Sequence, residues 1–420
     1  MGATESFVLG TEIEKVKEDV PTLFERDDVF QTSVLKSSEV EIISSRDMRI
    51  PQELRPGGYY GYYNPNGGSL GRGSGPQYDK AVIASTHHRF NIEWTTQAQW
   101  STDNSRKAVV NYFKKLLSTS MAEFRRQIEG QCMGSGDGVI GTISAVATNT
   151  PAGFDTLTLN SDGFRAKLVR YGQFINIYNA ALTTNRTAGN EQQIQFLDLP
   201  GAQIRIPTGV AGIIATDKIV ASGLSATPPV GLLGVQYHHN SASTGTWLGY
   251  DRSTTPEIRA NRVAAGGPLV LPFARLAMNK AGDRVGRQAM TGLTAWMHPA
   301  QAQAYEELGQ LVVQIHKQAK DEGLDLYFSD NMQMAGAGVK TSFCWDRTRI
   351  DFINKSYWGR AELHAAGFYE VDGVKIWPIR SSDGGLVTAQ IFTLVNSFNL
   401  FVTNPAGCTY IDTLSIPSGY

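Results

Sequence analysis

Two pairs of adjacent histidines, His87-His88 and His238-His239, are the residues best suited to bind a metal or move a proton. Neighbouring residues on a β-strand point to opposite faces of the sheet, so neither pair easily chelates a single ion. We therefore expect these histidines to lie at the surface or to be hydrogen-bonded, and we expect neither a metal site nor a cofactor.

Nucleophilic and acid–base chemistry finds equally little support. The three cysteines, Cys132, Cys344 and Cys408, are far apart and form no CxxC or zinc spacing, which indicates reduced thiols. The sequence contains no GxSxG, HExxH, Walker A, EF-hand or zinc-finger pattern. The adjacent carboxylates Glu306-Glu307 fall among polar residues of a predicted helix. We expect no catalytic residues and no enzyme.

One glycine pattern, Gly136, Gly138 and Gly141, matches GxGxxG. A dinucleotide site needs a strand before these glycines and a helix after them, whereas here a predicted helix comes first. We interpret the motif as a turn.

Composition favours an ordered, loop-rich α+β protein, because only 18% of residues are charged and 43 of 420 are glycine. The net charge of -1 gives no general attraction to nucleic acid or to an acidic membrane. Residues 219–250 and 386–402 are uncharged but interrupted by polar residues, so we expect buried strands and turns and no membrane span. The N-terminus lacks the features of a secretory signal.

The first 100 residues contain an acidic segment and a long loop. Residues 1–30 carry eight acids and three bases, which is typical of an exposed arm. Residues 57–78 hold eight glycines and five tyrosines, with Arg72 as their only charge. Loops of this length are usually disordered or functional. The tyrosines favour a contact role, and a flexible linker is the alternative.

The clearest predicted helix runs from about Ser105 to Glu129, with apolar residues at three- and four-residue spacing. Its other side is basic, with six Lys or Arg residues against two Glu. This set is either a solvated helix face or a surface that faces a polyanion.

Short strand-like segments separated by turn residues fill residues 155–220 and predict a small β-rich unit. Helical patterns follow at 271–282 and 299–320. The last 80 residues return to strands, with a predicted hairpin around Asp372-Gly373.

Three extended stretches resemble the major capsid proteins of tailed bacteriophages. They are VQYHHNSASTGTWLGYDRSTTPEIRANRV (235–263), TGLTAWMHPAQAQAYEELGQ (291–310), and the closing run from FINKSYWGRAELHAAGFYEVDGVKIWPI to NLFVTNPAGCTYID. The resemblance covers most of the chain from about residue 80. It implies the phage major capsid fold, and we expect the N-terminal segment to be retained, unlike in some relatives.

The resemblance implies seven segments, including the inserted β-rich domain, which varies within the family. They are an N-terminal arm (1–38), an extended loop hairpin (39–100), the spine helix and start of the peripheral domain (101–140), the inserted β-rich domain (141–230), a peripheral-domain connection (231–270), an axial domain (271–370), and a return to the peripheral domain (371–420).

The implied function is a major capsid protein that forms an icosahedral shell around the double-stranded DNA of a tailed phage. Implied partners are hexamers and pentamers of the chain itself, scaffolding, portal and decoration proteins, and non-specifically contacted DNA, with no membrane. The implied location is the virion, after assembly in the host cytoplasm. The alternatives are an encapsulin-type compartment, a β-rich carbohydrate-binding protein, or a hydrolase.

Two sets of residues are the candidate functional surfaces. We expect inter-subunit contacts from Tyr59, Tyr60, Tyr62, Tyr63 and Arg72. We expect a lumen-facing basic face formed by Lys107, Lys114, Lys115, Arg125 and Arg126, which would meet DNA or the acidic arm.

Overall fold

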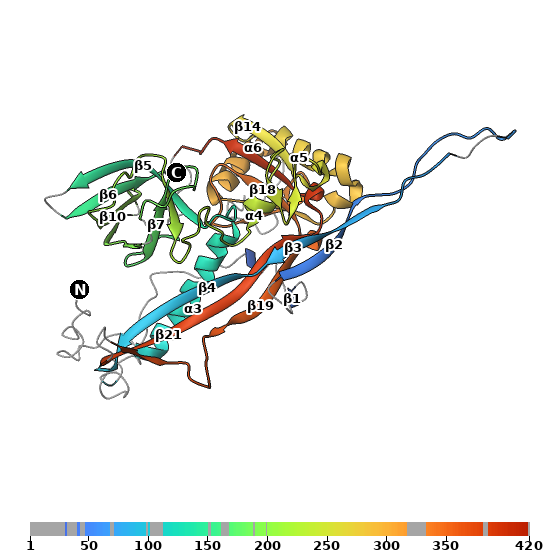
Figure 1. The fold of residues 1–420 in the computed structure, drawn as a ribbon. Helices are drawn as coiled ribbons and strands as arrows, with labels where there is room; N and C mark the ends of the chain where they lie inside the picture. The colour runs from blue at the N-terminus through green and yellow to red at the C-terminus, as the bar shows by residue number, and fades with distance from the viewer. Residues whose placement is uncertain are drawn as a thin grey trace.

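The structure is a computed structural model of the 420-residue chain (Figure 1). It describes residues 30–31, 40–42, 47–67, 71–97, 100, 112–149, 153–160, 168–187, 190–198, 200–316, 333–380 and 385–418. The first half of the predicted arm and residues 101–111 of the predicted spine helix lie outside this description.

A five-stranded sheet, called the long sheet below, forms the centre of the molecule. Its order is β1-β19-β21-β20, and β4 pairs with the other edge of β21. The strands are β1 (Val40–Ile42), β4 (Thr86–Thr95), β19 (Trp358–Phe368), β20 (Trp377–Arg380) and β21 (Leu386–Val402). Every second residue of β21 is buried, including Phe392, Leu394 and Phe398, because side chains alternate between the faces of a strand.

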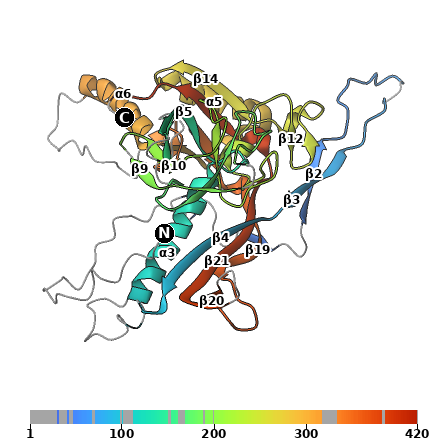
Figure 2. The same cartoon turned by 60° about the vertical axis from the view of Figure 1, so that its left-hand side comes forward.

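Helix α3 (Tyr112–Cys132) packs against the buried face of the long sheet. Phe124 and Ile128 lie in its apolar stripe, and Phe90 of β4 approaches Phe124 with ring centroids 6.1 Å apart. In Figure 2 the helix runs alongside β4 and β21. The described helix covers the second part of the predicted range and ends three residues later than predicted.

A two-stranded hairpin extends away from this body (Figures 1 and 2). Its strands are β2 (Asp47–Arg55) and β3 (Gln77–Ala84), paired from Asp47↔Ala84 to Arg55↔Gln77. Residues 56–76, called the tip below, connect their far ends.

Residues 139–221 form a seven-stranded sheet, called the insert below. Its order is β8-β7-β11-β5-β6-β10-β9, around a core rich in isoleucine. Its strands are β5 (Val139–Asn149), β6 (Phe154–Leu159), β7 (Phe174–Tyr178), β8 (Gln192–Gln193), β9 (Phe196–Asp198), β10 (Gln203–Pro207) and β11 (Lys218–Ala221). The glycine motif leads from α3 into β5 as a turn, as predicted: Gly136 and Gly138 have φ of 88° and 65°, which L-residues rarely adopt.

A six-stranded sheet with order β14-β22-β18-β15-β17-β16 forms a third unit. Its strands are β14 (Asn261–Gly267), β15 (Leu293–Met297), β16 (Gln333–Met334), β17 (Ala337–Thr341), β18 (Ile350–Asn354) and β22 (Thr409–Leu414). Helices α5 (Leu271–Val285) and α6 (Pro299–His316) contribute to its core. Residues 317–320, at the end of the second predicted helix, lie outside the description.

Short elements connect these units. They are α4 (Val235–His238), β12 (Thr246–Trp247), β13 (Tyr250–Asp251), and the 3-10 turns η5 (Pro256–Ile258), η6 (Arg287–Met290), η7 (Lys355–Tyr357) and η8 (Pro405–Gly407).

Three sequence-based details differ from the structure. The predicted boundary at residue 370 is too late for the sheets, because β19 already belongs to the long sheet. The chain does not end in the long sheet, because β22 pairs in parallel with β14 in the six-stranded sheet. The turn at Asp372-Gly373 exists, with Val371 and Val374 bonded across it, but the strands around it pair with β21 and not with each other.

Candidate interaction surfaces

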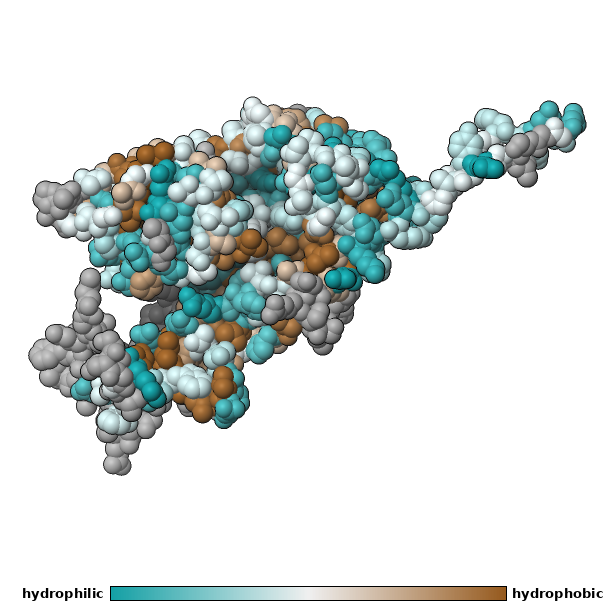
Figure 3. Space-filling view, in the orientation of Figure 1, coloured by the Kyte–Doolittle hydropathy of each residue, from teal (hydrophilic) through white to brown (hydrophobic). Residues whose placement is uncertain are grey.

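The tip exposes a cluster of aromatic side chains that no part of the described chain covers. Tyr59, Tyr60, Tyr62 and Tyr63 are 65–94% exposed, and the rings of Tyr60 and Tyr62 touch edge to face. The space-filling view in Figure 3 shows the tip standing clear of the body. Aromatic side chains gathered in this way typically mark a contact with another molecule. The predicted inter-subunit role of these residues and of Arg72, also exposed, remains a prediction.

The base of the hairpin is held firmly by the body. Ala81 and Ile83 are fully buried in one cluster with Trp247, and Val82 N–H donates to the Leu248 carbonyl across 3.0 Å. On β2, Arg55 forms a 3.1 Å ion pair with Glu257. The body therefore fixes the direction of the hairpin, while the tip has no such contacts among the described residues.

The basic face predicted for α3 is smaller than expected. Arg125 is exposed, but Arg126 is only 4% exposed because its guanidinium is drawn into an ion pair with Glu123 at 2.6 Å. Arg126 is therefore not part of an exposed face, which corrects the prediction for this residue. Lys114 and Lys115 lie in the first turn of α3 with side chains outside the description, as is Lys107 entirely.

Glu123 also joins the helix to the insert. Its Oε1 atom accepts hydrogen bonds from Arg126, from Gln127 at 2.9 Å and from Arg170 of the insert at 3.0 Å. Since Arg170 lies 47 residues away in the sequence, no helix-spacing argument could reveal this link. It ties the insert to the spine helix.

The described part of the N-terminal segment is anchored at the other end of α3. Phe30 is fully buried, and its ring meets Trp296 and Trp358 edge to face at centroid distances of 5.4 and 5.8 Å. The Glu129 carboxylate accepts the backbone N–H groups of Phe30 at 2.6 Å and Gln31 at 3.0 Å. The sequence analysis missed this anchor, since the acidic composition before Phe30 concealed one aromatic residue.

The histidine pairs serve structural roles, as hydrogen-bonded residues. His238 and His239 are fully buried at the end of a helix, and not on a strand as the chelation argument assumed. Trp247 Nε1–H can only donate, so His238 Nδ1 accepts it at 3.1 Å, and His238 Nε2–H donates to the Leu400 carbonyl at 3.2 Å. Burial lowers the pKa of His238 to about 3, which keeps this tautomer neutral.

His239 and Asp351 form a second buried pair, with Nδ1 and Oδ1 2.9 Å apart. Burial raises the pKa of Asp351, but Arg349 and His239 outweigh this effect and bring the pKa down to about 2. On β4, burial lowers the pKa of His88 to about 4. Among the residues described, no group of three or more His, Cys, Asp or Glu is arranged to hold a metal ion.

The cysteines lack the environment of a nucleophile. Cys132, Cys344 and Cys408 are all buried and unpaired. Burial, followed by the nearby Glu129, raises the pKa of Cys132, and burial likewise raises that of Cys408. Low thiolate content and lack of access make these thiols inert packing residues.

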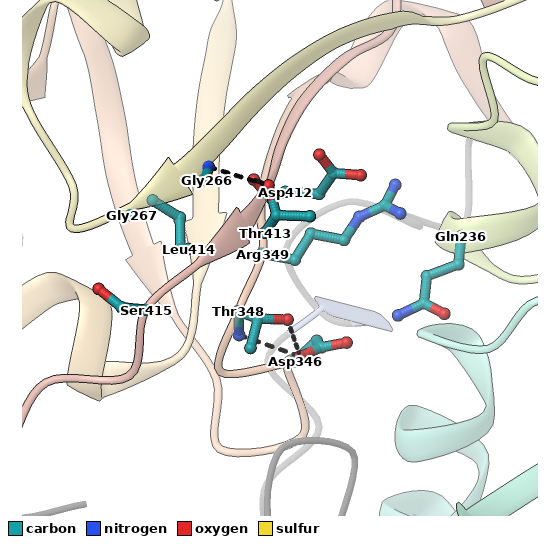
Figure 4. Close-up of a pocket in the computed structure, with 10 residues that line it drawn as sticks. All are labelled: Gln236, Gly266, Gly267, Asp346, Thr348, Arg349, Asp412, Thr413, Leu414 and Ser415. Carbon is teal, nitrogen blue, oxygen red and sulfur yellow. Dashed lines mark hydrogen bonds between the residues drawn. The ribbon is translucent and has the colours of Figure 1, made fainter. Parts of the chain in front are cut away.

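A cavity of about 510 Å³ lies between β14, β22 and the turn before β18 (Figure 4). Its charged groups already have partners: Arg349 donates to Asp351 at 2.8 Å, and Asp412 pairs with Arg262 at 2.7 Å. Asp346 accepts two bonds from Thr348. The cavity therefore contains no side chain poised for catalysis, and no described helix is long and apolar enough to cross a membrane.

A scan against family models and a search of curated proteins found no match. Among solved structures, the chain is similar to a protein of the cyanophage A-1(L) capsid, with a TM-score of 0.58, 12% identity, and coverage of 96% of this chain and 97% of that one.

Two weaker similarities span a comparable length. A capsid of a native GTA particle gives a TM-score of 0.46 at 10% identity, with 98% of this chain and 97% of that one covered. An encapsulin complex from Synechococcus elongatus gives 0.45 at 7% identity, with 96% and 94% covered. The cyanophage comparison shows that the chain has the phage capsid fold, as the sequence resemblance implied.

Proposed function

We propose that this chain is the major capsid protein of a tailed phage. It self-assembles into hexamers and pentamers, which build an icosahedral head shell around double-stranded DNA. It is a virion component that assembles in the host cytoplasm, has no enzymatic activity, and works with scaffolding, portal and decoration proteins. These assignments go beyond the shared fold and rest on the resemblance together with the surfaces of the molecule.

The observation that carries the proposal is the long hairpin with its exposed tyrosines. A monomeric protein gains nothing from holding four tyrosines far from its own core, since exposed aromatic clusters promote association. A hairpin fixed at its base and bare at its tip is suited to reach a neighbouring copy. This arrangement, on the fold of a phage capsid protein, favours a shell subunit.

The basic residues of α3 fit the same proposal. Lys107, Lys114, Lys115 and Arg125 would line the inside of the shell and face either DNA or the acidic arm. We favour the arm, because a wall that binds DNA strongly would hinder packaging and ejection of the genome. The position of Phe30, anchored to Glu129 one turn from Arg125, supports this choice, since the acids of the arm end two residues earlier in the sequence.

An encapsulin-type compartment is the alternative with the same fold, and it would enclose protein. The insert and the long tip favour the phage shell. Electron microscopy of the expressed protein, with its nucleic-acid and protein content measured, tests both: closed shells support a capsid role, and particles that contain a specific protein cargo would favour the compartment.

A further inference from the structure

A large groove separates the insert from the long sheet. Its volume is about 1470 Å³, and α3, β4, β19 and the insert all contribute to its walls. Six consecutive residues of β4, Thr86–Asn91, line it, followed by Glu93. Side chains of a strand alternate between its faces, so a groove lined by consecutive residues runs along the edge of the strand.

That edge of β4 has unpaired backbone groups. β4 pairs with β21 in one unbroken antiparallel register, from Thr86↔Phe398 to Thr95↔Ala389. Within the part of the chain that is described, no strand pairs with its other side, and no backbone N–H or C=O of residues 86–93 bonds elsewhere. An open strand edge is a template for another extended segment.

The tip is the segment of this protein whose chemistry matches the groove. Backbone groups of residues 59–63 have no hydrogen-bond partner among the residues described, so they are available to pair with a strand edge. The tip glycines allow the close backbone approach that strand addition requires. Tyr171 and Phe174 of the insert and Tyr369 after β19 offer aromatic walls to the tip tyrosines.

Charge favours the same occupant. Four glutamates and two arginines line the groove, which gives a net charge of -2 with neutral histidines. The tip carries a single charge, the positive one of Arg72. Of the carboxylates, Glu93 of β4 is exposed, and no described residue forms a hydrogen bond or ion pair with it.

We propose that the free edge of β4 receives the tip of a second copy of this chain, which adds an extended strand to the long sheet inside the groove. This inference rests on the proposed shell function and names the surface that each tip contacts. A tip cannot fill its own groove by this route, because the hairpin base directs it away from the body.

Photo-crosslinking in assembled particles tests the contact directly. With p-benzoylphenylalanine in place of Tyr62, irradiation should join two chains, and mass spectrometry should find the link on peptides containing residues 86–93 or 170–174. The same probe in place of Tyr78, at the hairpin base, should not label those peptides. Normal particles whose Tyr62 probe labels only other surfaces would overturn the inference and leave the shell function standing.

A matched pair of insert variants gives a second readout. Tyr171 in the groove and Ile214 outside it are both exposed, at 70% and 55%. Tyr171→Asp should leave a folded subunit with most of its particle yield lost, whereas Ile214→Asp should assemble normally. Equal yields from the two variants would contradict a tip in the groove. Failure of the wild-type chain to form any particle would instead refute the shell function, and this inference with it.

Discussion

The backbone N–H of Phe30 donates to Oε1 of Glu129 across 2.6 Å, although 99 residues separate the two in the sequence. The bond joins the N-terminal segment to the last turns of the spine helix, while the Phe30 ring enters a pocket of tryptophans. Both residues are fully buried. The N-terminal segment is thus part of the folded subunit at this point, and not only a loose extension.

Removing the Phe30 ring should destabilise the subunit strongly. Phe30→Ala leaves a cavity among tryptophans, and large-to-small changes of this kind cost about 3 to 5 kcal/mol. Phe343→Ala removes a ring that is 56% exposed and serves as the control, with a much smaller expected loss. Urea unfolding of the unassembled variants measures both, and equal losses would contradict the anchor.

Deleting residues 58–76 should separate folding from assembly. The deletion removes the tyrosines but leaves β2, β3 and their buried base intact, so the subunit should keep its circular dichroism spectrum. Particles should form poorly, because the contact between copies is lost. Normal shells with wild-type stability from this variant would show that the tip has no contact role.

Acid should destabilise the subunit. The pKa of His238 falls from 6.5 to about 3 on folding, so the unfolded chain binds a proton that the folded chain refuses. The resulting stability is complete above pH 6.5 and is lost as the pH falls toward 3. The pKa of Asp351, lowered from 3.8 to about 2, extends the loss below pH 3.8.

Unfolding free energies measured between pH 8 and pH 4 would check this dependence. Each pKa unit corresponds to about 1.4 kcal/mol of stability. His238→Asn should flatten the profile, and His364→Gln, which changes an exposed histidine, should not. A wild-type stability that rises on acidification would contradict the buried neutral histidines.

Charge reversal on α3 distinguishes its two possible partners. Lys114→Glu combined with Lys115→Glu should impair assembly of empty shells if the acidic arm pairs with this face. Exposed ion pairs contribute only about 0 to 1 kcal/mol each, so the effect should fall on assembly and leave subunit stability nearly unchanged. A variant that forms normal empty shells and fails only to retain DNA would favour the genome as partner.

Mature particles should contain no covalent links between subunits. Lys80 is the only lysine of the hairpin, and it lies on β3 near the base, away from the tip. Denaturing gels should therefore show a single band near 45.8 kDa. A ladder of heavier bands would mean that a cross-link forms by another route.

Local patterns predicted the local structure well. Alternation in residues 386–402 gave the long strand β21, and reversed order around Gly136 ruled out a nucleotide site. Partners from distant parts of the chain could not be predicted. Arg126 looks exposed from helical spacing and is buried because Glu123 joins it to Arg170, and β22 joins a sheet with β14, almost 150 residues upstream.

The central claim is that this chain forms a closed shell, and electron microscopy of the purified protein at assembly concentrations tests it most directly. We predict closed particles of uniform size with icosahedral symmetry, built from pentamers and hexamers, with density for the hairpin tip on the adjacent subunit. A protein that stays a monomer or small discrete oligomer under all assembly conditions, including with scaffold, would contradict the claim.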